Sequence, residues 1–93
     1  MTATIARDLD AFFGANDARI QTELFEFLRI PSVSARSEHN ADTARAAHWL
    51  ATAMRTIGLT TRVEPTPGHP IVVGEWRKAP PGAPTVLVYG HYD

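Results

Sequence analysis

The chain has no cysteine, and this absence limits the chemistry that its 93 residues can carry. Without thiols there is no disulfide framework, no cysteine nucleophile and no thiolate ligand for zinc. Any bound metal must therefore be held by imidazole and carboxylate groups.

The charge pattern lacks a bias toward either sign. Nine basic residues stand against ten acidic ones, and the formal net charge is −1. No basic block or stripe is present, so we expect no nucleic-acid partner. A long hydrophobic run is also missing, and the first ten residues include Arg7, Asp8 and Asp10 where a signal peptide would be apolar. We therefore expect no membrane partner and a cytoplasmic location.

The composition is that of an ordinary globular chain, with 44% hydrophobic and 20% charged residues. Its length suits one domain and not two. A chain this short buries a modest share of its surface, so its stability alone is expected to be marginal.

The first half of the chain predicts two helical regions, at about residues 4–30 and 41–57. In the first region, Gly14 to Asp17 interrupts the apolar spacing, and Asn16 or Asp17 can cap a new start, which predicts two helical pieces or one kinked helix. Pro31 ends this region, because the residue before a proline is pushed out of the helical conformation. The apolar residues at helical spacing are Ile5, Leu9, Phe12, Phe13, Ile20, Leu24, Phe27 and Leu28, then Ala44, Ala47, Leu50, Ala51, Met54 and Ile57.

Gly58 follows the second helical pattern where a left-handed cap residue is typical, and Leu59 is placed to make the accompanying apolar contact. From there the pattern predicts strands at about 59–64, 71–76 and 85–89, rich in β-branched and apolar residues. The third is almost continuously apolar, as for a strand buried on both faces. We therefore predict an α/β fold in which N-terminal helices are followed by strands of a central sheet.

The strongest candidate site follows the third predicted strand. Ligands in open α/β sheets bind outside the carboxyl ends of strands, and the sequence there is Gly-His-Tyr-Asp at 90–93. In extended backbone His91 and Asp93 project to the same side. A neutral imidazole can bind a metal through one nitrogen while its other N–H donates to a carboxylate. His91 is therefore a candidate metal ligand and Asp93 the candidate residue that orients it.

A histidine paired with a nearby aspartate, without any ligand, is the ordinary alternative. A catalytic zinc also needs about three protein ligands, and His39, His48 and His69 show no metal-binding spacing. We interpret His48 as a partly exposed helix residue and His69 as a turn residue. The serines at 32, 34 and 37 have no general base arranged near them in sequence, so a serine nucleophile is not expected.

Four segments, in this order, resemble the start of the M20 metallopeptidase family, particularly its dipeptidase branch. They are Phe27-Leu28-Arg29-Ile30-Pro31-Ser32-Val33-Ser34, Ala46-Ala47-His48-Trp49-Leu50, Gly68-His69-Pro70-Ile71-Val72-Val73-Gly74-Glu75-Trp76 and Val86-Leu87-Val88-Tyr89-Gly90-His91-Tyr92-Asp93. The resemblance implies that residues 1–93 are the N-terminal portion of one M20-like catalytic domain. That domain would be a larger zinc-peptidase unit, of which this is an incomplete part.

The resemblance further implies a homodimeric enzyme that hydrolyses dipeptides or short peptides with a water activated by two divalent ions, most often zinc. His91 matches the first metal ligand of the family and Asp93 the catalytic aspartate that orients it. The other ligands and the general base come later in family members, so the 93 residues alone are expected to be inactive. An M20 amidohydrolase acting on N-acyl amino acids and a non-enzymatic α/β module that binds a partner chain stay open as alternatives.

Overall fold

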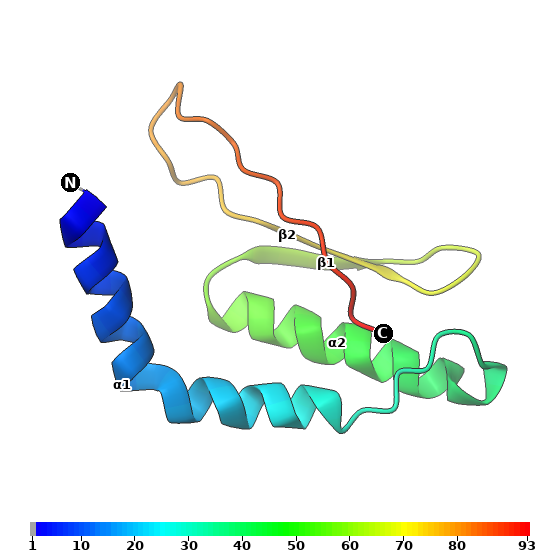
Figure 1. Ribbon diagram of the computed structural model, residues 1–93. Coiled ribbons are helices and arrows are strands. Elements are labelled where there is room, and N and C mark those ends of the chain that lie inside the picture. The colour runs from blue at the N-terminus through cyan, green and yellow to red at the C-terminus, as the bar shows by residue number, and fades with distance from the viewer. Residues whose placement is uncertain (1) are drawn as a thin grey trace.

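The computed structural model describes residues 2–93. Helix α1 spans Thr2–Leu28, and a short 3-10 helix, η1, spans Ser37–His39 and leads into α2, Asn40–Thr56. Strands β1 (Thr60–Glu64) and β2 (Ile71–Glu75) follow and pair antiparallel. Figure 1 shows the hairpin lying along α2, with the second half of α1 on the other side of that helix. The predicted mixed helix-and-strand fold is confirmed in this form.

Helix α1 is one continuous helix that bends in its middle (Figure 1), so the kinked alternative of the prediction is confirmed. Asn16 does not cap a second helix; its side-chain amide donates to the carbonyl of Phe12 at 2.8 Å, within the turn before it. None of the residues of α1 is buried, although its apolar side chains follow the predicted spacing. Helix α1 contacts α2 through the rings of Phe27 and Trp49, whose centroids lie 5.1 Å apart.

Helix α2 ends in the cap that the sequence predicts. Gly58 has a φ of +97°, and its N–H donates to the carbonyl of Arg55 at 3.0 Å. The N–H of Leu59 reaches back to the carbonyl of Met54 at 3.1 Å, which completes a Schellman motif. The chain thereby turns directly from α2 into β1.

The core lies between α2 and the hairpin. Ala46, Ala47 and Ala51 are fully buried along one face of α2, and Thr43 is buried on the same face with its hydroxyl donating to the carbonyl of His39 at 3.0 Å. Small side chains let a helix approach a sheet closely, because little volume separates the two backbones. The hairpin has the register Val63↔Val72, so its two strands present one shared surface to α2.

The predicted third strand at 85–89 is wrong for the described part of the chain. The backbone from residue 84 onward is irregular, and its apolar side chains are exposed, with Val86 at 82% and Leu87 at 91%. A strand needs a neighbour that accepts and donates ladder hydrogen bonds, and within residues 2–93 no backbone pairs with this segment. In the described residues the apolar sequence of this segment therefore marks neither a paired strand nor a buried one.

A turn at Pro80–Ala83 directs this segment back along the hairpin. The N–H of Ala83 donates to the carbonyl of Pro80 at 3.1 Å, and Gly82 has a φ of +85°, as the third residue of a type II turn requires. Figure 1 shows the chain reversing at this tip and returning past β2 to end beside α2.

The described chain is open in shape. Its radius of gyration is 16.1 Å, whereas a compact domain of this length has one of about 12 Å. The bent α1 and the tip at residues 80–83 account for the extension seen in Figure 1. In the part of the chain that the structure describes, no helix is long and apolar enough to span a bilayer.

The helix cap yields a paired test. We expect Gly58→Ala to lower the free energy of unfolding by about 1 kcal/mol, because a Cβ is strained at this positive φ. Gly14→Ala is the matched control, since Gly14 lies inside α1 with open space around it, and there alanine favours the helix by up to about 1 kcal/mol. Urea denaturation followed by circular dichroism measures both. Equal effects of the two substitutions would contradict the role given to Gly58.

Candidate functional site

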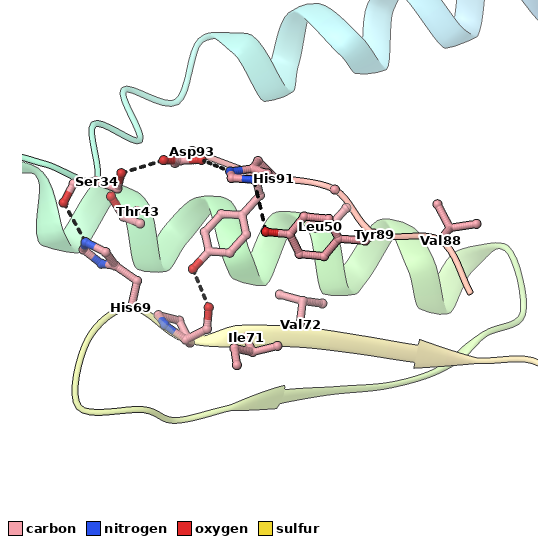
Figure 2. Close-up of a pocket in the computed structure, with 13 residues that line it drawn as sticks. Ser34, Thr43, Leu50, His69, Ile71, Val72, Val88, Tyr89, His91 and Asp93 are labelled. Atoms are coloured by element: carbon pink, nitrogen blue, oxygen red, sulfur yellow. Dashed lines mark hydrogen bonds and ion pairs between the residues drawn. The ribbon is translucent and has the colours of Figure 1, made fainter. Parts of the chain in front are cut away.

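The Gly-His-Tyr-Asp segment borders a hollow of about 380 Å³ between β2, α2 and the end of the chain. Figure 2 shows Ser34, Asp93 and His91 in a row along its upper side, with His69 below Ser34 at the start of β2. The walls combine these polar groups with apolar side chains from the strand and the helix, among them Leu50, Ile71, Val72 and Val88.

Asp93 is held by the loop that follows α1. The hydroxyl of Ser34 donates to Oδ2 of Asp93 at 2.6 Å, although the two residues lie 59 positions apart in the sequence. This hydrogen bond is the main reason that the pKa of Asp93 lies below its ordinary value, with a smaller contribution from His91 and an opposing one from burial.

Tyr92 anchors the same segment on the opposite side. Its hydroxyl donates to the carbonyl of Pro70 at 2.6 Å, and its own carbonyl accepts from the hydroxyl of Ser32 at 3.2 Å. Partial burial, followed by the negative charge of Asp93, raises the pKa of the Tyr92 phenol. The backbone between His91 and Asp93 is thus fixed from two directions.

His91 itself is accessible, with 69% of its side chain exposed. Its Nδ1 lies 3.4 Å from Oδ1 of Asp93, a little longer than a good hydrogen bond, and its Nε2 lies 3.1 Å from the hydroxyl of Tyr89. A carboxylate only accepts, so a neutral His91 facing Asp93 carries its proton on Nδ1. Nε2 then carries the lone pair, which accepts the hydrogen bond from the Tyr89 hydroxyl and which a metal would use in place of that hydroxyl.

This arrangement fits one metal ligand and not a complete metal site. Asp93 stands on the Nδ1 side of His91, as a residue that orients a ligating imidazole does. Among residues 2–93, however, no three histidine or acidic side chains gather closely enough to hold an ion. His91 and Asp93 would therefore supply one ligand and its orienting partner, and no further step is assigned to them.

His69 takes a structural position beside the site. Its Nε2 lies 2.8 Å from the carbonyl of Ser34, and since a carbonyl only accepts, the ring donates this hydrogen bond. The turn before it is closed by Thr66, whose hydroxyl donates to the carbonyl of His69 at 2.6 Å. The sequence prediction of a turn residue is confirmed, and the ring holds the loop that carries Ser34.

The other two histidines lie outside the cluster. His48 is exposed on α2 and borders a separate groove near Arg45 and Trp49. His39 precedes α2 and its Nδ1 lies 2.9 Å from Oδ2 of Asp42. Neither is hydrogen-bonded to His91 or Asp93 in the described residues.

Sequence reasoning missed Ser34 and His69 as parts of the site. Ser34 was set aside because no general base stands near it in sequence, and its partner turned out to be an acid on a distant segment. The spacing of residues in a sequence does not reveal a contact between two side chains that lie 59 positions apart. The segments ending at Ser34 and Asp93 and the one containing His69 nevertheless meet in space.

Comparisons with known proteins add no family assignment: no protein-family model, no curated protein and no solved structure matches this chain.

Asp42 yields a test of pH dependence at the start of α2. Hydrogen bonds from His39 first, and then from Arg45, lower the pKa of this carboxyl below its ordinary value of 3.8. A lowered folded-state pKa means that the stabilisation is fully present above pH 3.8 and is lost as the pH falls through the folded value. We therefore expect Asp42→Asn to unfold more easily than the wild type at neutral pH, with a difference that shrinks below pH 3.8.

Thermal unfolding between pH 2 and 7 measures this difference. Glu38→Gln is the matched control, because Glu38 lies in the preceding turn and contacts only the exposed Arg36, at 3.0 Å. A constant difference between wild type and Asp42→Asn across the whole pH range would contradict the assignment.

Proposed function

We propose that the chain belongs to the catalytic domain of a metal-dependent dipeptidase of the M20 type. The observation that carries this proposal is the placement of Asp93 on the Nδ1 side of His91, at 3.4 Å, which leaves Nε2 as the nitrogen that would bind a metal once the Tyr89 hydroxyl, 3.1 Å away, is displaced. The ordered resemblance of the four segments to that family supports the same assignment.

In this proposal, two divalent ions, most often zinc, activate a water and polarise the scissile carbonyl. His91 contributes one imidazole ligand, and Asp93 fixes the orientation of that ring. The resemblance to M20 enzymes implies that the remaining ligands and the general base would lie outside residues 2–93, and among these residues no three-ligand group is found. Residues 2–93 by themselves are therefore expected to be inactive.

The exposed apolar segment near the site supports a larger catalytic domain. Val86, Leu87 and Val88 are more than four-fifths exposed, and their backbone makes no ladder hydrogen bonds within the described residues. An exposed segment with apolar side chains and unpaired backbone N–H and C=O groups is normally covered by further strands or by a partner. In the proposed enzyme, neighbouring strands of a central sheet would cover it.

Zinc binding and peptide hydrolysis test the proposal in the intact protein. We expect metal-stripped protein to bind zinc in a calorimetric titration and the loaded protein to hydrolyse dipeptides. His91→Ala should weaken binding by more than the roughly 10- to 100-fold that losing a supporting residue costs, because it removes a direct ligand. His48→Ala, on the far groove of α2, is the matched control and should bind like the wild type.

The choice of substrate separates the two M20 activities. Cleavage of dipeptides with no action on N-acyl amino acids supports the dipeptidase, and the reverse supports the amidohydrolase alternative. Unchanged zinc binding and activity in His91→Ala would contradict the metal-ligand assignment.

A second candidate is a partner-binding module, and the exposed segment Val86–Tyr89 is the observation that favours it. An exposed apolar segment with unpaired backbone can receive a partner strand through main-chain hydrogen bonds if it becomes extended on binding. This alternative expects a fold indifferent to metal, so a melting temperature that zinc leaves unchanged and a partner chain raises would support it over the enzyme.

A further inference from the structure

The two carboxylate oxygens of Asp93 face different partners, Ser34 on one side and His91 on the other. Oδ2 accepts a hydrogen bond of 2.6 Å from the Ser34 hydroxyl, while Oδ1 faces Nδ1 of His91 at 3.4 Å. A short hydrogen bond to one oxygen of a carboxylate restricts its rotation, so it also limits where the other oxygen can lie. The hydrogen bond between Ser34 and Asp93 therefore limits where Oδ1 of Asp93 can meet His91.

Ser34 is itself held in place by a second segment. The ring of His69 donates to its backbone carbonyl at 2.8 Å, from the turn that precedes β2. Next to His69, the carbonyl of Pro70 accepts from the Tyr92 hydroxyl at 2.6 Å. The hydrogen bond from His69 to Ser34 thus joins the loop that holds Asp93 to the turn that holds Tyr92. The Ser34 hydroxyl therefore has a defined position relative to the Asp93 carboxylate.

From this geometry we propose that Ser34 is a positioning residue, which orients the Asp93 carboxylate and thereby keeps the proton of His91 on Nδ1. The inference rests on the proposed function in one respect only: Nε2, which lies 3.1 Å from the Tyr89 hydroxyl in this structure, is the ring nitrogen that would bind a metal in place of that hydroxyl. Figure 2 shows the row from Ser34 through Asp93 to His91. Without the Ser34 hydroxyl, the carboxylate can rotate and the imidazole can exchange its tautomers.

The alternative is that Ser34 only ties the loop after α1 to the end of the described chain. A structural tie of this kind would change the melting temperature of a variant without changing the tautomer of His91. The tautomer is therefore the readout that separates the two roles.

Nuclear magnetic resonance of ¹⁵N-labelled histidine in the intact, metal-stripped protein reads the tautomer directly. We expect wild type to hold His91 with the proton on Nδ1, Ser34→Ala to give a mixture of both tautomers, and Ser34→Thr to restore the wild-type state. Ser37→Ala is the matched control, because Ser37 lies exposed in η1 and its hydroxyl does not contact Asp93. An unchanged tautomer in Ser34→Ala would overturn the proposal.

Zinc titration of the same variants provides the second readout. Loss of a residue that supports a metal ligand weakens metal binding by roughly 10- to 100-fold, and we expect Ser34→Ala to fall in this range with recovery in Ser34→Thr. In a background of Asp93→Ala, the Ser34→Ala change should have no further effect, since the two residues act in series. Additive losses would overturn the proposal even if both variants fold.

The outcomes for Ser34 and for the proposed function are distinguishable. Wild-type zinc affinity in Ser34→Ala overturns the positioning role while the dipeptidase proposal stands. Failure of the wild type itself to bind zinc overturns the dipeptidase proposal, and the tautomer comparison between wild type, Ser34→Ala and Ser34→Thr then decides the positioning role alone.

Discussion

Close packing of α2 against the hairpin is the constraint on which the rest of the structure depends. The fully buried residues of that interface, Ala46, Ala47 and Ala51, are small, so helix and strands meet with little side-chain volume between them. Gly74 on β2 belongs to the same contact, because a Cβ there would collide with Met54 and press on Leu59. The small side chains of Ala46, Ala47 and Ala51 bring α2 close to the hairpin, and the site is built at one end of this pair.

The packing of α2 against the hairpin explains how distant segments reach one another at the site. The loop after α1 leads into the start of α2, and the turn carrying His69 leads into the start of β2, so both arrive at the same end of the interface. The final segment returns between them and is held by Ser34 and by the carbonyl of Pro70. Ala46, Ala47 and Ala51 thus bring α2 and the hairpin together. The hydrogen bonds of Tyr92 and Asp93 then attach the final segment to this pair.

Local physical rules were sufficient to predict the elements, because their causes lie within a few residues. The cap at Gly58, the stop before Pro31 and the two paired strands follow from backbone sterics, proline chemistry and side-chain alternation. The segment at 85–89 could not be predicted in the same way, since strand formation needs a neighbour and sequence periodicity does not reveal whether one is present. The bend of α1 was predicted, but the exposure of its apolar face was not.

For the site, the sequence predicted that His91 and Asp93 lie close together but not what positions them. The spacing of two residues brings that pair together in any extended backbone, so no tertiary information was needed. Ser34 acts across the fold, and its hydroxyl chemistry alone suggested a nucleophile, which the absence of a base excluded. Its partner in the structure is an acceptor, so its role is to donate. A donor that fixes a carboxylate has no sequence signature of its own, and only the packing of α2 against the hairpin turns it into part of the site.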